Sequence, residues 1–177
     1  MLIAGIIGAT VVFVNRLPEA VISIKTTTTT VTLVPTSSST STTTIDPALA
    51  VLTANATQFR EAAAALAVSA VDLNAEWDNG DFNFTTAKTK FTEYRDSVND
   101  FKNEVLSASV LEELDDVWAP VVNSTQAMTD AAGEMLEGLL DAKSATGRRD
   151  GLAAIGISQE ALDAALVELL SAIGTVG

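Results

Sequence analysis

The sequence predicts an all-α fold, an antiparallel up-down-up-down four-helix bundle that follows a disordered Thr/Ser-rich tether and an N-terminal apolar helix. Apolar residues recur in alternating steps of four and three through four long stretches after residue 45. Residues 26–44 contain fifteen serines and threonines among nineteen positions, and residues 2–14 carry no charge. We therefore expect an anchor or signal segment at 1–25, a flexible linker at 26–44 and the bundle at 45–177.

The N-terminal apolar stretch, LIAGIIGATVVFV, runs from Leu2 to Val14. Thirteen helical residues rise only about 20 Å, which is less than the roughly 30 Å of a hydrocarbon core. Three interpretations stay open: a short membrane anchor with Arg16 reaching toward the headgroups, a gene start placed too far downstream, or a secretion signal that is cleaved. The alternative to all three is an apolar arm that packs on the bundle.

The segment that follows, TTTTTVTLVPTSSSTSTTT at 26–44, is expected to be coil. Serine and threonine have modest helix propensity, and Pro35 removes a backbone donor. A flexible chain of this length spans about 25 Å on average and at most about 65 Å. The segment is therefore predicted to be a tether, either unmodified or O-glycosylated.

The first two helices are expected at about 46–79 and 83–106. Asp46 and Pro47 form an N-cap and a first-turn proline, and Asn79-Gly80 ends the first helix. The buried stripe of the first helix is predicted to be Ile45, Leu49, Leu52, Ala56, Phe59, Ala63, Leu66, Ala70, Leu73 and Trp77. That of the second is Phe84, Ala87, Phe91, Tyr94, Val98, Phe101 and Val105.

The last two helices are expected at about 109–142 and 150–173. Ser109 and Glu112 predict a capping box, Pro120 predicts a bend, and Gly174 predicts the final helix end. The third stripe is Leu111, Leu114, Trp118, Val121, Thr125, Met128, Ala132, Met135 and Leu139. The fourth is Leu152, Ile155, Gln159, Leu162, Leu166, Leu169 and Ile173. The alternative architecture is a pair of helical hairpins that completes its core by dimerising.

The two polar positions in these stripes, Thr125 and Gln159, lie at similar heights on either side of the third connection. We predict that they share a layer and form a hydrogen bond, which fixes the register of the last two helices. The alternative is that they line a ligand cavity. Glycines at 133, 138, 151 and 156 gather near the same connection and permit a close approach of the two helices.

The composition argues against catalysis. The chain has no histidine and no cysteine, which excludes nucleophiles, general bases and zinc sites that need those side chains. No catalytic, cofactor-binding or metal-ligating residue is predicted, and we expect the protein not to be an enzyme. All acidic residues except Glu19, and all basic residues except Arg16 and Lys25, lie from Asp46 onward, which leaves 22 acidic against 8 basic residues there. Such a surface repels phosphate backbones, so nucleic acid is not an expected partner.

Two groups of acidic residues are candidates for a metal-binding site. They are Glu112, Glu113, Asp115 and Asp116, and Glu134, Glu137 and Asp141. All fall outside the apolar stripes, so we interpret them as a solvated surface. DNGDFN at 78–83 resembles the start of a calcium loop, but Thr89 stands where that loop needs glutamate. We therefore interpret it as the end cap of one helix joined to the start cap of the next.

These features favour a membrane-tethered, extracytoplasmic protein with a noncatalytic binding or structural role in the cell envelope. Its expected partners are the membrane, through the N-terminal segment, and an envelope protein or a second copy. The outline resembles the extracytoplasmic four-helix domains of bacterial receptors and, in its threonine-rich tether, many bacterial envelope proteins. The first resemblance implies the alternative function, a small-ligand sensor or solute-binding module.

Overall fold

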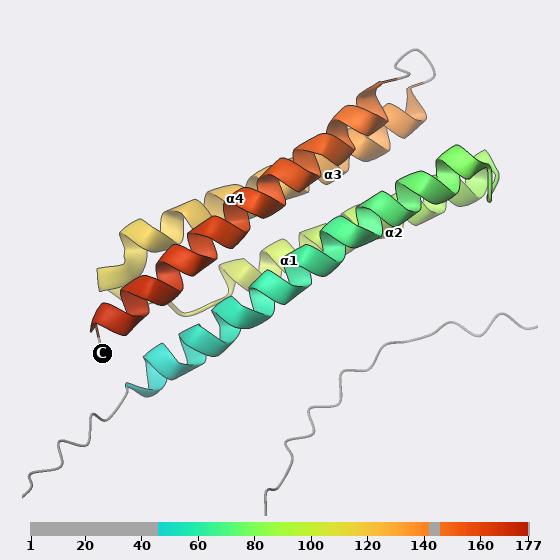
Figure 1. Ribbon diagram of the computed structural model, residues 1–177. Coiled ribbons are helices and arrows are strands. Elements are labelled where there is room, and N and C mark those ends of the chain that lie inside the picture. Colours follow the sequence, from blue (N-terminus) through green and yellow to red (C-terminus); the bar gives the residue numbers. More distant parts are fainter. Residues whose placement is uncertain (1–45, 142–145, 177) are drawn as a thin grey trace, which may run out of the picture. The chain divides into compact units, whose positions relative to one another are not determined.

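The computed structural model describes residues 46–141 and 146–176 (Figure 1). This part of the chain is all-helical, which confirms the predicted class. Its helices are α1 (Pro47–Asn79), α2 (Phe84–Leu106), the short 3₁₀ helix η1 (Glu112–Leu114), α3 (Asp115–Leu140) and α4 (Gly147–Val176). The predicted anchor at 1–25 and the predicted linker at 26–44 lie outside the described residues.

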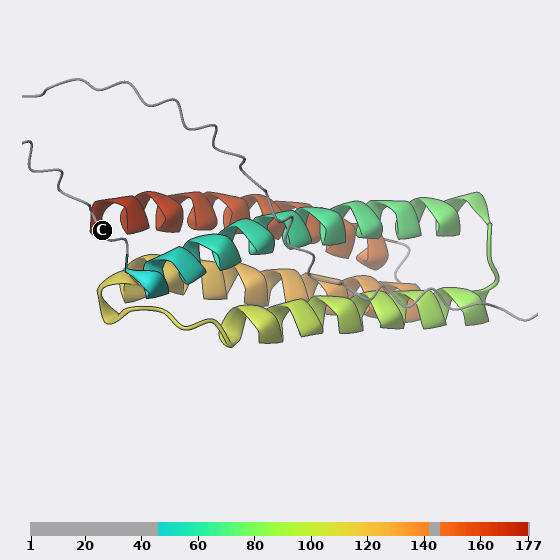
Figure 2. The ribbon, with the colours of Figure 1, turned by 90° about the horizontal axis from the view of Figure 1, so that it is seen from below.

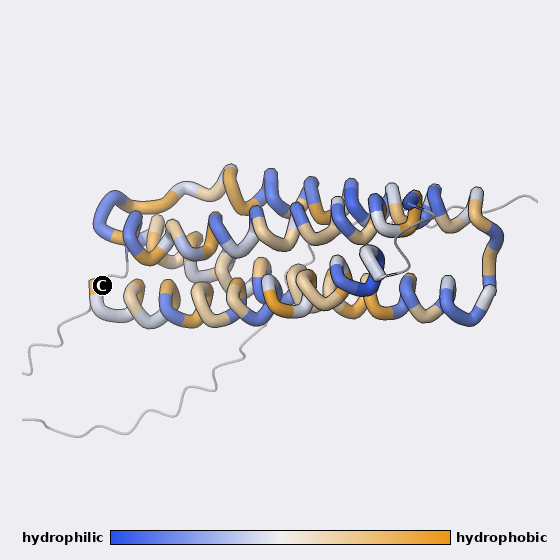
Figure 3. The backbone as a smooth tube through the Cα atoms, turned by 90° about the horizontal axis from the view of Figure 1, so that it is seen from above, coloured by the Kyte–Doolittle hydropathy of each residue, from blue (hydrophilic) through white to orange (hydrophobic). Residues whose placement is uncertain are grey.

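The four long helices form a helical bundle. α1 packs against α2 and α4, and α3 packs against the same two helices, with α3 and α4 in the most extensive contact. Helices that follow one another along the chain run in opposite directions (Figure 2). Hydrophilic and hydrophobic residues alternate along every helix (Figure 3). Each helix therefore faces the core with its apolar side and solvent with its polar side.

Both ends of α1 are formed by the residues that the sequence indicates. Asp46 accepts a hydrogen bond from the Ala48 amide at 2.8 Å, and Pro47 is the first helical residue. Gly80 adopts a left-handed conformation, with φ of +77°, and its N–H donates to the carbonyl of Trp77. A side chain at this position would be strained, so glycine defines the end of the helix.

The DNGDFN stretch is confirmed as two joined caps. After Gly80 the chain turns, and Asn83 starts α2 by accepting a hydrogen bond from the Thr86 amide at 3.0 Å. The asparagine oxygen thus satisfies an amide that would otherwise lack a partner in the first turn. Helix capping thus accounts for Gly80 and Asn83 in this stretch.

The predicted start of the third helix at Ser109 is wrong. Residues 108–111 are not helical, and η1 begins after Leu111, which is extended and makes no side-chain cap. Ala108, Val110 and Leu111 instead pack their side chains against the core. Burial of these apolar side chains favours an extended connection over the Ser109 capping box. Pro120 lies in the second turn of α3.

The predicted limits of the fourth helix are too narrow. α4 begins at Gly147 rather than near residue 150, with the Thr146 carbonyl accepting from the Arg149 and Asp150 amides. It also continues through Gly174 to Val176. A helical glycine costs only about 1 kcal/mol, and Gly174 does not take the left-handed conformation that ends α1.

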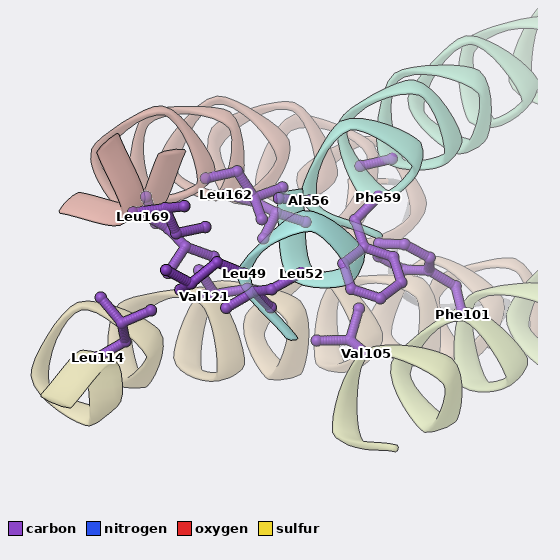
Figure 4. Packing of buried hydrophobic residues seen from close by; sticks show 14 residues of the cluster. Leu49, Leu52, Ala56, Phe59, Phe101, Val105, Leu114, Val121, Leu162 and Leu169 are labelled. Atoms are coloured by element: carbon purple, nitrogen blue, oxygen red, sulfur yellow. The ribbon is translucent and has the colours of Figure 1, made fainter. Parts of the chain in front are cut away.

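The core consists of two clusters of buried side chains. The first contains residues of all four long helices, with Phe59 and Phe101 in edge-to-face contact at 6.1 Å between ring centres (Figure 4). The second fills the other end of the bundle and includes Phe91, Met128 and Met135, which are at most 1% exposed. Together with the partly buried side chains packed against them, the clusters hold every described apolar position of the predicted stripes except Phe84. Ile45, the first position of the first stripe, lies outside the described residues.

Phe84 is the exception among the predicted core aromatics. Its side chain is 50% exposed, whereas Phe91, Tyr94 and Phe101 are buried. Phe84 is the first residue of α2, and there it lies edge-on to Trp77 with 6.5 Å between ring centres. The helical period extends to this first residue of α2, but the core does not.

Two glycines allow α3 and α4 to touch through their backbones. A Cβ at Gly138 would stand 2.1 Å from the Arg148 backbone nitrogen, and one at Gly151 would stand 2.5 Å from the Met135 nitrogen. A real Cβ atom cannot occupy either place. The expected close approach is therefore found at Gly138 and Gly151, whereas Cβ positions at Gly133 and Gly156 face open space.

Candidate functional site

A cluster of polar side chains surrounds Asp78, where the end of α1 meets the start of α4. Arg148 donates from Nη2 to Asp78 Oδ1 at 2.6 Å, and Nη2 of Arg149 lies 3.6 Å from Oδ2. Asn74 donates from Nδ2 to the same Oδ2 at 3.3 Å. One carboxylate therefore holds side chains of two helices together.

Arg148 is the charged residue that the core encloses at this end. Only 7% of it is exposed, and its Nη1 atom has no hydrogen-bond partner among the described residues. The same is true of Asn74 Oδ1. Burial of a guanidinium is costly unless a carboxylate compensates its charge, so Asp78 is required for Arg148 to lie here.

The sequence carried a signal for this contact. Counting back one heptad from the buried Ile155 leads to Arg148, so Arg148 continues the apolar stripe of α4. Because the sequence predicts that the fourth helix begins only near residue 150, the predicted stripe does not include that position. The partner Asp78 was identified only as part of a helix cap.

A second ion pair joins α1 and α4 further along. Arg60 donates from Nε to Asp163 Oδ1 at 2.6 Å and from Nη2 to Oδ2 at 3.2 Å, a bidentate geometry. The hydrogen bond and the negative charge of Asp163 raise the pKa of Arg60. These residues line a surface hollow of about 280 Å³ with Thr57, Glu61 and Ala64.

Between the two ion pairs, both helices carry a stretch without charged residues, at 62–71 on α1 and 151–159 on α4. Three large apolar side chains are exposed there: Val68 at 60%, Val71 at 55% and Ile157 at 70%. Small residues, Ala64, Ala153 and Gly156, are found on the same surface. We name this group of six residues the apolar patch.

Helical spacing places the apolar patch on the outer side of α1 and α4. Val68 and Val71 lie one heptad beyond Glu61 and Ala64, which line the hollow beside Asp163. Gly156 lies one heptad before Asp163, and its Cβ position meets no atom within 4 Å. Ile157 lies one heptad after Asp150, which lines a hollow between α3 and α4. The patch therefore extends from α1 across the exposed side of α4.

The two residues of the predicted polar pair lie in different environments. Thr125 is 1% exposed, and its hydroxyl donates to the Val121 carbonyl of its own helix at 2.8 Å. Gln159 is half-buried on α4. No hydrogen bond joins the two among those formed by the described residues, and the threonine hydroxyl donates its proton to its own backbone instead. A role of the pair in fixing register stays a prediction.

The acidic groups are exposed, as predicted. Glu112 and Glu113 lie in the first turn of η1, and Asp115 and Asp116 lie in the first turn of α3, where negative charge is favourable. Glu134, Glu137, Asp141 and Asp150 line an open hollow of about 380 Å³ with Gly138 and Gly147. Within residues 46–141 and 146–176, no group of acidic residues has a geometry that could hold a metal ion.

Tyr94 is the buried titratable group of the core. Its hydroxyl has no hydrogen-bond partner in the described part of the chain, and burial raises the pKa of the phenol. The side chain therefore stays neutral far above physiological pH, which suits a packing role rather than acid–base chemistry.

No protein-family model, curated protein or solved structure matches the chain. Among the helices of the described residues, none combines the length and the apolar character that crossing a membrane requires. The function must therefore be inferred from the chain itself.

Proposed function

We propose that this protein is a membrane-tethered, extracytoplasmic helical bundle with a noncatalytic binding or structural role in the cell envelope. In this proposal, residues 1–25 hold the chain at the membrane, residues 26–44 separate it from the surface, and the bundle presents its outer faces to a partner. The partner is an envelope protein or a second copy of the chain.

The single observation that carries the proposal is the order of three segments along the sequence. A charge-free apolar stretch at 2–14 precedes a segment of mostly serine and threonine, and an acidic helical region follows. Hydroxyl-rich segments of this kind are typical of stalks that hold a domain away from a surface. The 22 acidic residues from Asp46 onward keep such a domain soluble and repel it from anionic lipids.

Three features of the described residues support a noncatalytic role. The acidic side chains are exposed or half-buried rather than fully buried, the buried arginine is bonded to a carboxylate, and the buried tyrosine is kept neutral. Catalytic acids and bases usually depend on burial or a close charge to shift their pKa toward neutrality. The described residues instead have the distribution expected of a packed scaffold.

Cell fractionation tests the location. The full-length chain with a C-terminal tag should sediment with membranes, and protease added outside intact cells should remove the tag. A matched variant without residues 2–24 should appear in the soluble cytoplasmic fraction. Recovery of the full-length chain in that soluble fraction, with its tag protected from protease, would refute the proposal.

The alternative function is an extracytoplasmic small-ligand sensor or solute-binding module. The larger hollow has a suitable volume, about 380 Å³, but four carboxylates line it. Small-molecule sites are usually apolar with a few polar groups, so this lining fits a solvated surface better. A thermal-shift screen decides between the two: a metabolite that raises the melting temperature by several degrees would favour the sensor.

A further inference from the structure

The apolar patch contains the most exposed large apolar side chain of the described residues, Ile157, and neither the core nor the ion pairs explain it. We propose that it is a docking surface for a basic amphipathic helix of a partner protein. The proposal rests on the binding role above and adds the binding face and the chemistry of the partner.

The shape of the apolar patch suits the side chains of an incoming helix. Val68 and Val71 stand on one side, Ile157 stands on the other, and the small residues Ala153 and Gly156 lie between them along α4. The open Cβ position of Gly156 leaves the helix backbone accessible to a large apolar side chain. A helix binds such a surface through anchors spaced at three and four residues.

The charges around the apolar patch select a basic partner. Glu61 and Asp72 border it on α1, and Asp150 and Glu160 border it on α4, all with exposed side chains. Arg149 is the basic side chain nearest in sequence to the α4 part, and it is engaged with Asp78 at 3.6 Å. Lysine or arginine flanking an apolar stripe would complement this border.

The same border argues against a second copy as the occupant. Two patches facing each other would bring the acidic borders together, in a region where acidic residues already outnumber basic ones by 22 to 8. Like charges in contact across an interface oppose association. Charge therefore favours a basic helix over self-association.

A binding experiment with the full-length chain tests the proposal. The probe is a synthetic helix with leucine at heptad spacing and lysine elsewhere, compared with the same peptide carrying glutamate in place of lysine. We expect binding of the lysine peptide alone. Val68→Ser and Gly156→Gln, which remove one anchor and fill the open position, should each weaken binding about tenfold.

The chain offers a matched control for each variant. Val51 is as exposed as Val68, at 60%, and lies near the other end of α1. Gly133 is helical with an open Cβ position like Gly156, but it lies on α3, which contributes nothing to the apolar patch. Val51→Ser and Gly133→Gln should leave the dissociation constant unchanged.

The proposal is overturned if Val68→Ser and Gly156→Gln bind the lysine peptide as tightly as Val51→Ser and Gly133→Gln do, because the peptide would then bind by charge alone. It is also overturned if sedimentation reveals a dimer that Val68→Ser dissociates. A cytoplasmic location with patch-dependent peptide binding would remove the tether from the proposed function and leave the docking surface intact.

Discussion

Arg148 Nη2 lies 2.6 Å from Asp78 Oδ1, so the second residue of α4 is bonded to the second-last residue of α1. The contact joins residues 70 positions apart in sequence. Arg148 is almost fully buried, whereas the Asp78 side chain is 36% exposed. The ion pair therefore closes one end of the bundle and fixes the start of α4 against α1.

Asp78→Asn is predicted to destabilise the bundle, because it leaves the buried guanidinium without a compensating charge. We expect the free energy of unfolding to fall by about 1–3 kcal/mol in a urea titration. Asp81→Asn is the matched control, since Asp81 is exposed in the same turn, and it should have no measurable effect. Arg148→Met should cost less than Asp78→Asn, because it removes the buried charge rather than its partner. Equal losses in the Asp78 and Asp81 variants would contradict this account.

Gly138→Ala is predicted to separate the end of α3 from the start of α4. The added Cβ would overlap the Arg148 backbone, and relief of that overlap should cost about 1–3 kcal/mol of stability. Gly133→Ala meets no neighbour and should instead stabilise α3 by about 0.5–1 kcal/mol. Thermal unfolding of the two variants should thus shift in opposite directions. A shift of both variants in the same direction would show that the close backbone contact is absent.

Phe59→Ala is predicted to remove a central part of the first core cluster. Phe59 is 3% exposed and packs edge-on against Phe101, so its loss should cost about 3–5 kcal/mol. Phe84→Ala removes the same side chain from a half-exposed position and should cost less than about 1 kcal/mol. Urea midpoints measure both changes. Comparable losses would place Phe84 in the core, as its helical spacing predicted.

Tyr94 is predicted to make stability fall at high pH. Burial raises the pKa of the folded phenol above the unfolded value of about 10. At a pH between the unfolded and the folded pKa, the folded chain holds a proton that the unfolded chain has lost. The free energy of unfolding therefore decreases by about 1.4 kcal/mol for each pH unit above about pH 10. Tyr94→Phe should remove this component of the dependence. Tyr94 is the single tyrosine of the chain, so tyrosinate absorbance reports it directly. Ionisation at the ordinary pH in the folded protein would contradict its burial.

The helical stripes could be predicted from sequence because burial follows the helix period wherever a helix has neighbours. Leu52, Val98 and Leu166 each lie in a predicted stripe and are at most 1% exposed. The caps at Asp46 and Gly80 were equally predictable, since capping depends on local hydrogen bonds.

Other features depended on contacts that local patterns do not contain. Phe84 keeps the helical spacing but lies beyond the end of the core. Ser109 does not cap a helix, because the neighbouring apolar residues pack in an extended segment. Prediction of the Asp78–Arg148 pair from the sequence required the correct start of α4. It also required the fact that the start of the α4 stripe lies beside the end of α1. These features were fixed by packing between helices.

The most direct test of the central claim, that the four helices pack into one bundle through their apolar stripes, is native-state hydrogen exchange of the full-length chain. The amides of Leu52, Val98, Met128 and Leu166, one in each long helix, should be strongly protected and open with closely similar free energies. Residues 107–111 should exchange faster, because they lie between helices. Exchange of any one of the four helices at the rate of an unstructured chain would contradict the bundle.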